Sequence, residues 1–338
     1  MSDGLVFVQR NDSHNAVIMF RRDEDGGLTE VVSVETGGSG GDEPHLPSQG
    51  SVVLAGDGRR LLVANAGGDD VTLFAIPDDG NLRRLGRVRA GARPRSVAEH
   101  EGLVYVLATG VPAVQGFRMT DTGLEPIADG DAALVADADP AQVAFTPDGS
   151  AVVVTERGTN AITVFPVAPD GSLGVARSVT SAGPTPYGFA FTTTGVLVVT
   201  EAFGAEKGAA AASSYWVAGT DVTPVTRSAG NGRSEICWVV VTPDDRFAYT
   251  TNFADGAVSS YAIAADGRLT LENATAGLTV DGRPGLRDVA LTADGRFLYA
   301  LDADSGSLFG WSVLENGRLS PLGSWGGLPL TAAGLAAT

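Results

Sequence analysis

The sequence is poor in residues on which many kinds of functional site depend. It has one cysteine, Cys237, and three histidines among 338 residues. A single cysteine excludes an intrachain disulfide framework and any site built from several cysteines. His14, His45 and His100 are scattered, without the spacing of a metal site, so we expect neither a metal nor another cofactor.

Positive charge and long apolar runs are also scarce. The chain has 23 Lys and Arg against 40 Asp and Glu, a net charge of −17. This balance disfavours nucleic acid and anionic membrane surfaces as partners. No segment approaches the ~18 consecutive apolar residues of a membrane helix. The opening "MSDGLVFVQRND" lacks the basic region of a signal peptide, so we expect a cytoplasmic protein.

Turn residues, by contrast, are abundant, with 45 Gly and 17 Pro. A unit that contains a turn recurs along the chain, as in "TPDGSAVVVTE" (146–156), "TPDDRFAYTTN" (242–252) and "TADGRFLYALD" (292–302). The turn residues of the seven units are Gly4, Gly58, Gly102, Gly149, Gly195, Asp245 and Gly295. No segment has a convincing helical period, so the repeat indicates a protein built from short strands.

Each unit has the same four-strand plan. Apolar stretches lie before and after the turn, a third follows a loop, and a short fourth follows a second Asp-Gly or Asn-Gly turn, which supplies the positive φ of tight hairpins. Seven such units predict an all-β, seven-bladed β-propeller, with four antiparallel strands per blade and residues 1–338 as one domain. The first unit lacks its first strand, and "AAGLAAT" (332–338) matches it. We therefore expect the C-terminal strand to join the N-terminal blade and close the ring, which leaves a monomer as the expected state.

The blade plan also predicts where a ligand would bind. The first strand of each blade runs along the central channel to the turn, and the second strand returns. The starts of the first strands and the ends of the second strands therefore share one face, which we call the mouth face. The turns lie on the opposite face, the turn face. A ligand site in the channel mouth would draw its side chains from the mouth face.

Two glutamates stand out at the ends of the second strands. The units place Asn11, Asn65, Thr109, Glu156, Glu201, Asn252 and Asp302 there. Asn and Asp cap turns by bonding their own backbone, whereas Glu does so poorly. Glu156 and Glu201 are therefore candidates for a catalytic acid and base. The alternative for each is a solvated carboxylate or one paired with arginine.

The starts of the first strands vary most from unit to unit. The candidate ligand-binding residues in this region are Gln49, Arg95, Gln142, Tyr187, Cys237, Trp238, Arg287 and Asp288. Arginine suits carboxylate or phosphate, so this set predicts a small polar or acidic molecule at the channel mouth. Cys237 has no histidine placed to activate it, and inert packing is the alternative role for it.

The repeats at 146–165 and 242–271 resemble the lactonase family of seven-bladed β-propellers, which includes 6-phosphogluconolactonase and the 3-carboxy-cis,cis-muconate lactonizing enzyme. The resemblance covers essentially the whole chain and implies metal-independent chemistry that uses His, Arg and Glu in the channel. Where the family has His-Pro-His, residues 139–142 read Asp-Pro-Ala-Gln. Where it has Pro-Arg-His, residues 186–188 read Pro-Tyr-Gly, and its Asn-Glu pair aligns with Glu-Ala at 201–202.

Three functions fit these observations. The first is a lactonase-like enzyme that hydrolyses or forms a small polar or acidic lactone, with Glu156 or Glu201 as general base and Arg95 or Arg287 orienting the substrate. The second is a non-catalytic propeller that binds a small molecule or a protein partner. The third is an enzyme of another class, whose channel is rebuilt around Cys237 and the two aromatic residues of the binding set. We favour the first.

Overall fold

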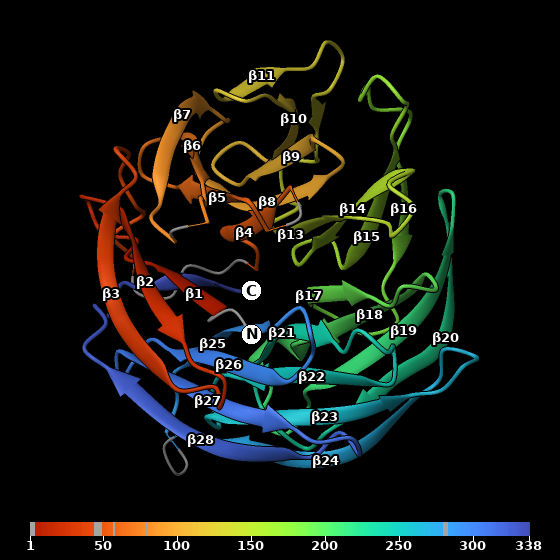
Figure 1. Ribbon diagram of the computed structural model, residues 1–338. Helices are drawn as coiled ribbons and strands as arrows, with labels where there is room; N and C mark the ends of the chain where they lie inside the picture. Colours follow the sequence, from red (N-terminus) through yellow and green to blue (C-terminus); the bar gives the residue numbers. More distant parts are fainter. Residues whose placement is uncertain (1–3, 44–48, 57, 79, 280–282) are drawn as a thin grey trace.

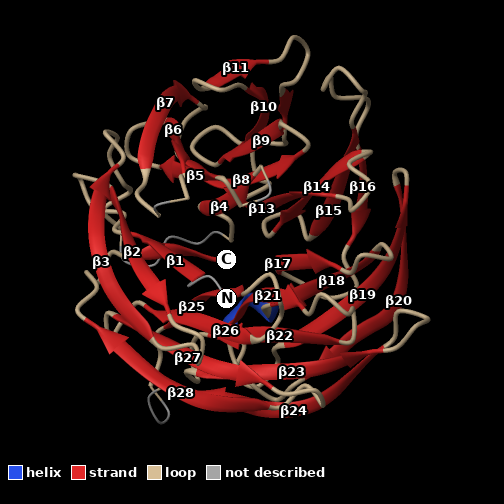
Figure 2. Cartoon of the chain, viewed as in Figure 1, coloured by secondary structure: helices blue, strands red, loops and turns tan. Residues whose placement is uncertain are grey.

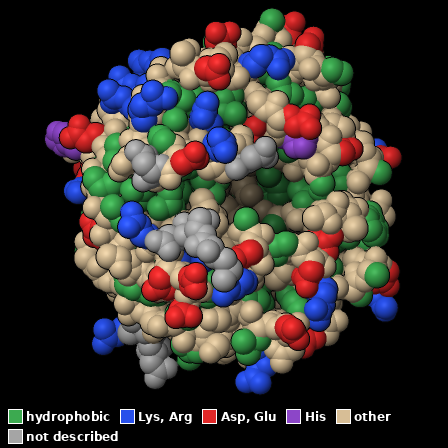
Figure 3. All heavy atoms as spheres, viewed as in Figure 1, with side chains coloured by type: hydrophobic (Ala, Val, Ile, Leu, Met, Phe, Trp, Pro, Cys, Tyr) green, Lys and Arg blue, Asp and Glu red, His purple; other side chains and the backbone are tan. Residues whose placement is uncertain are grey.

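The computed structural model describes residues 4–43, 49–56, 58–78, 80–279 and 283–338. They form seven antiparallel sheets arranged as blades around a central channel (Figures 1 and 2). A space-filling view along the same direction shows the ring hollowed at its centre (Figure 3). The single helical element of the described residues is a short 3-10 helix, η1 (Phe203–Ala205). None of the described helical structure has the length and apolar character needed to cross a bilayer.

The predicted seven-bladed propeller is confirmed, and its strands run outward from the channel in a fixed order. Blade 1 is β29 (Ala333–Ala337), β1 (Gly4–Gln9), β2 (Ala16–Arg22) and β3 (Leu28–Glu35). Blade 2 is β4 (Val52–Ala55), β5 (Arg60–Asn65), β6 (Asp70–Ala75) and β7 (Arg83–Arg89). Blade 3 is β8 (Pro94–His100), β9 (Leu103–Ala108), β10 (Ala113–Met119) and β11 (Leu124–Pro126), with the short β12 (Ala132–Ala133) also against β10.

The remaining blades repeat this plan with four strands each. Blade 4 is β13 (Pro140–Phe145), β14 (Ala151–Glu156), β15 (Ala161–Pro166) and β16 (Arg177–Thr180). Blade 5 is β17 (Pro186–Phe191), β18 (Val196–Glu201), β19 (Ala211–Ala218) and β20 (Asp221–Gly230). Blade 6 is β21 (Ile236–Val241), β22 (Phe247–Asn252), β23 (Ala257–Ile263) and β24 (Leu269–Leu278). Blade 7 is β25 (Leu286–Leu291), β26 (Phe297–Asp302), β27 (Ser307–Val313) and β28 (Leu319–Gly326).

The C-terminal strand closes the ring, as the sequence predicts. β29 pairs antiparallel with β1, with Phe7 opposite Ala336. A hydrogen bond then joins this blade to its other neighbour, since the Gly334 N–H donates to Asp288 Oδ2 of β25 at 2.7 Å. The first and last segments of the chain therefore build one sheet, and the inner edge of β1 is paired rather than exposed.

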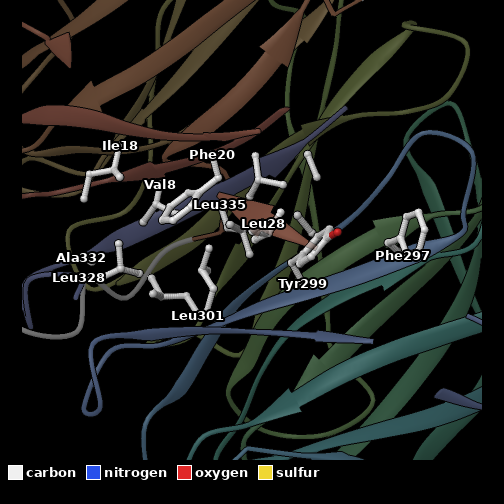
Figure 4. Close-up of a cluster of buried hydrophobic side chains, with 14 residues drawn as sticks. Val8, Ile18, Phe20, Leu28, Phe297, Tyr299, Leu301, Leu328, Ala332 and Leu335 are labelled. Carbon is white, nitrogen blue, oxygen red and sulfur yellow. The ribbon is translucent and has the colours of Figure 1, made fainter. Parts of the chain in front are cut away.

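The core lies between the blades. Successive side chains of a strand point to opposite faces of its sheet, so each blade packs on both neighbours. In blade 1, Val8 and Leu335 pack with Tyr299 of blade 7 in a buried cluster (Figure 4). The adjacent Phe7 instead packs with Phe74 of blade 2. This alternation explains why the inner strands read as continuous apolar runs.

A repeated backbone contact organises the mouth face. In five blades, the residue before the first strand accepts a hydrogen bond from the N–H of the residue just after the second strand. The acceptor and donor pairs are Arg93 and Thr109, Asp139 and Arg157, Thr185 and Ala202, Glu235 and Phe253, and Gly285 and Ala303. All five acceptor residues have positive φ. The start of each first strand therefore lies beside the end of the second, as the blade plan requires.

Candidate functional site

Several predicted binding residues gather at the mouth end of the channel. The Tyr187 ring of β17 packs on the Trp238 ring of β21, with 4.6 Å between ring centroids. Cys237 and Arg287 lie close enough to Tyr187 to act electrostatically on its hydroxyl group. Arg95 of β8 belongs to the same group, because Tyr187 acts electrostatically on it in turn. These residues come from four different blades, so only the closed ring brings them together.

Arg157 completes this group, and sequence reasoning missed it. Its Nη1 donates to Tyr187 Oη at 3.2 Å, and its guanidinium lies 4.9 Å from the centroid of the Tyr187 ring. Its Nη2 also donates to Asp139 Oδ1 at 2.6 Å. The comparison of the repeats used the last residue of each second strand, which is Glu156 in this blade. Arg157 is the next residue, and a comparison of that position would have found it. The same position in blade 6 holds Phe253, and the Arg287 guanidinium lies over that ring at 4.2 Å from its centroid.

The cluster has positive charge and unused hydrogen-bond donors. Burial, together with nearby Arg93 and Arg157, lowers the pKa of Arg95 to about 10, so this group stays protonated at neutral pH. Its Nη2 donates to Glu43 Oε2 at 2.9 Å. The buried Nε of Arg95 and the buried indole Nε1 of Trp238 have no acceptor among the described residues. Since buried N–H groups are nearly always paired, these two are unusual unsatisfied donors within the cluster.

Tyr187 and Cys237 are neutral components of the cluster. Burial raises the pKa of each to about 12. The Cys237 thiol donates to the carbonyl oxygen of Glu235 at 3.4 Å. A thiol with this pKa carries almost no thiolate at neutral pH, and thiolate is the nucleophilic form. Burial therefore argues against a nucleophilic role for Cys237, and its contact with a ligand stays a prediction.

The two candidate catalytic glutamates form hydrogen bonds with hydroxyl groups on the outer strands of their own blades. Glu156 is buried, and its carboxylate accepts from Thr163 Oγ1 at 2.5 Å and from Thr159 Oγ1 at 2.6 Å. Thr163 lies on β15, farther from the channel than β14, which carries the glutamate. This carboxylate therefore ties the end of β14 to the loop and strand that follow.

Glu201 has a denser set of partners. Its carboxylate accepts from the Gly183 N–H at 2.7 Å, from Ser213 Oγ at 2.6 Å and from Ser228 Oγ at 2.7 Å. Ser213 and Ser228 lie on β19 and β20, the two outer strands of the blade. The geometry gives both glutamates a structural role, and their assignment as general base stays a prediction.

Three polar residues of the predicted binding set connect one blade to another around the channel. The Gln142 side chain exchanges two hydrogen bonds with the Phe189 backbone, at 2.7 and 2.9 Å. The Gln49 amide does the same with Val239, at 2.7 and 3.2 Å, and so links the start of blade 2 to blade 6. Asp288 binds the Gly334 N–H, as described above. We call Gln49, Gln142 and Asp288 the polar belt, and their contact with a ligand stays a prediction.

Metal ligands do not gather in the described part of the chain. No three His, Cys, Asp or Glu side chains there are grouped as a metal ion would require. His14 is exposed beside the β1–β2 connection, while His100 lies at the end of β8 on the turn face. His45 lies outside the described residues.

Comparison with known proteins identifies the family. The model of the lactonase family, described as a 7-bladed beta-propeller, matches residues 6–124, 97–203 and 200–325. The chain therefore belongs to the lactonase family of seven-bladed β-propellers. No curated protein sequence matches it.

Solved structures show the same fold at low sequence identity. The periplasmic gluconolactonase of Pseudomonas aeruginosa has a TM-score of 0.78 and 19% identity, and the match covers 99% of this chain and 98% of that one. A protein from Lactobacillus plantarum has a TM-score of 0.77 and 16% identity, over 100% of both chains. A functionally unknown protein from Desulfotomaculum acetoxidans has a TM-score of 0.76 and 14% identity, over 99% of both.

Proposed function

We propose that this propeller hydrolyses small acidic lactones at the mouth end of its channel. One observation carries the proposal. Around the packed rings of Tyr187 and Trp238 lie three arginines, Arg95, Arg157 and Arg287, although the whole chain has a net charge of −17. Such a concentration of cations in an acidic protein suits a ligand that carries a carboxylate or phosphate. Membership of the lactonase family, and the gluconolactonase among the similar structures, support a lactone as that ligand.

The cluster offers distinct groups for the acid and for the ring of such a substrate. Guanidinium groups bind carboxylate and phosphate through paired N–H donors. The Tyr187 ring, which is 9% exposed and packs on the fully buried Trp238, is the aromatic surface that the ring of a lactone can contact. The partly exposed guanidinium groups of Arg95 and Arg157 supply donors for a carbonyl oxygen as it becomes an oxyanion, which is where fixed donors lower a barrier most.

Asp139 is the carboxylate that we assign as general base. It is held by Arg157, and its side chain is 60% exposed, so water reaches it. In the proposed step, a water oxygen bonds to the lactone carbonyl carbon while Asp139 takes a proton from that water. The bond between this carbon and the ring oxygen then breaks, and the proton passes to the ring oxygen. The product is a hydroxy acid, which releases its acidic proton to solvent.

Titration of released acid at constant pH tests this function. The panel contains 6-phosphogluconolactone, muconolactone and the neutral glucono-δ-lactone, each corrected for spontaneous hydrolysis. We expect turnover of an acidic lactone and a fall in kcat of at least about 100-fold in Asp139→Asn, the usual scale for a general base. The control is Glu206→Gln, an exposed carboxylate in the loop that follows β18.

The same experiment separates the alternatives. A loss confined to Glu156→Gln or Glu201→Gln, in variants that remain folded, would move the base to the residue predicted from sequence. Saturable binding of the lactones without turnover would support a non-catalytic binding propeller instead. Absence of both binding and turnover would contradict the proposed substrate class.

A further inference from the structure

A cavity lies in the channel, on the turn-face side of the polar belt. Its volume is about 390 Å³. Gln49, Gln142 and Asp288 line its inner end, while Glu99 and His100, at the end of β8, line its outer part. We call this cavity the turn-face chamber. The side-chain amide of Gln49, bonded through its oxygen and its nitrogen to the Val239 backbone of β21, lines this chamber.

The chamber has the opposite charge from the mouth. Asp288 and Glu99 are its acidic lining residues, and no Lys or Arg is among the described residues that line it. Glu99 accepts hydrogen bonds from the N–H groups of Gly56 and Gly102, at 3.2 and 2.7 Å. Within the described part of the chain, neither carboxylate forms an ion pair. The described lining of the chamber therefore has carboxylates without lysine or arginine, whereas the carboxylates at the mouth, Glu43 and Asp139, are paired with arginine.

Ionisation of the Asp288 carboxyl group is unfavourable in this position. Its residue is 3% exposed, and the one hydrogen-bond partner of its carboxylate in the described chain is the Gly334 N–H. Burial raises its pKa to about 7, although the Gly334 hydrogen bond and Arg287 act in the other direction. A buried carboxylate without a close counter-charge is stabilised by any cation that reaches it.

The walls of the chamber indicate what kind of cation would fit. Apolar side chains from four inner strands line it, including Val53, Val97, Val289 and Leu335. A metal ion needs several oxygen ligands, but the amide groups of Gln49 and Gln142 are already bonded to backbone. An alkyl chain, by contrast, gains by contact with these walls. Size agrees, because small-molecule pockets begin at roughly 300 Å³.

We propose that the turn-face chamber is a second ligand site, which binds a small organic cation with its ammonium group at Asp288 and its carbon chain against Val53, Val289 and Leu335. The site is separate from the three arginines at the mouth, and the proposal does not depend on lactone hydrolysis. Its specificity rests on two features together: a buried carboxylate at the inner end and apolar walls that a hydrated metal ion would not contact.

Calorimetric titration tests the proposal with three probes of one shape: n-butylammonium chloride, n-butanol and sodium butyrate. We expect saturable binding of n-butylammonium, with at least about 10-fold weaker binding of the alcohol and the acid, since one of them lacks the charge and the other reverses it. Asp288→Asn should weaken n-butylammonium binding at least about 10-fold. Glu315→Gln, which removes an exposed charge in the same blade outside the chamber, should leave it unchanged. Equal affinity for butanol, or unchanged binding in Asp288→Asn, would overturn the proposal.

A second measurement uses the native protein, so that the site can be tested even if the Asp288→Asn variant fails to fold. Magnetisation transfer in solution NMR should connect the butyl chain to the methyl groups of Val289 and Leu335. Binding without such contacts would place the probe elsewhere and overturn the site. Displacement of the probe by magnesium chloride, beyond the effect of sodium chloride at equal ionic strength, would overturn the choice of an organic cation.

Discussion

The environment of Glu201 gives a direct prediction about stability. Glu201 is fully buried, and its carboxylate binds the Gly183 N–H and the hydroxyl groups of Ser213 and Ser228. Hydrogen bonds to a charged group contribute about 1.5–3 kcal/mol each. Alanine removes these three bonds and the longer one from Ser181 Oγ at 3.3 Å, although the serine hydroxyls can turn to other acceptors. We therefore expect Glu201→Ala to lower the free energy of unfolding by about 3–5 kcal/mol.

Urea unfolding, followed by tryptophan fluorescence and by far-ultraviolet circular dichroism, measures this loss. Coincident transitions with an unchanged m-value would show that the shift in midpoint reflects native-state stability. Glu206→Ala is the matched control, because Glu206 is exposed and exposed substitutions change stability by about 0.5 kcal/mol or less. A loss below about 1 kcal/mol in Glu201→Ala would refute the structural role of this carboxylate. A catalytic defect in a fully stable Glu201→Gln protein would support the role predicted from sequence.

Three further predictions concern Asp288, Cys237 and Gly334. Burial raises the pKa of Asp288 from 3.8 to about 7 in the folded protein. The stability that its bound proton contributes is therefore complete below about pH 4 and is lost as the pH rises to 7. Between these pH values Asp288→Asn should remove up to about 4 kcal/mol of the change in the free energy of unfolding, and an unaltered slope would contradict the burial argument. Because burial raises the pKa of Cys237 to about 12, a thiol-specific disulfide reagent at pH 8 should label the native protein at least about 100-fold more slowly than the urea-unfolded chain, and comparable rates would show an accessible thiolate. Gly334 has a φ of +71°, and a Cβ there would clash with Ser51 Oγ, so Gly334→Ala should destabilise the protein at its ring closure by about 1–3 kcal/mol. An unchanged urea midpoint would contradict this expectation.

The fold could be predicted from sequence because its signals are local and repeated. An Asp-Gly turn between two apolar stretches specifies one hairpin, and seven copies leave a propeller as the simplest way to bury all of them. The missing first strand at residue 4 and the spare strand at 332–338 indicated the ring closure. Repetition also placed Arg95, Tyr187 and Arg287 at the same position of their blades, so their meeting at the mouth followed from the architecture.

The roles of individual side chains were harder to predict. The pairing of first and second strands is irregular near the mouth, with register shifts between Pro140 and Gln142 and between Pro186 and Phe189. Such a shift changes which face of the sheet a residue occupies. Strand position alone could not show that Glu201 bonds outward, or that Gln49 reaches a blade that is not its neighbour. Arg157 lies in a loop, where the repeat gives no guide to side-chain direction.

The central claim is that the arginines at the mouth select an acidic lactone. The most direct test is the ratio of kcat/KM for 6-phosphogluconolactone to that for glucono-δ-lactone, which differ by the phosphate, in the native protein and in Arg157→Met. The control is Arg177→Met, which removes an exposed arginine that pairs with Asp221 on the outer strands. We predict that the ratio falls about 10- to 100-fold in Arg157→Met, the effect of losing charge-assisted hydrogen bonds, and is unchanged in the control. A ratio that is the same in all three proteins would contradict the account.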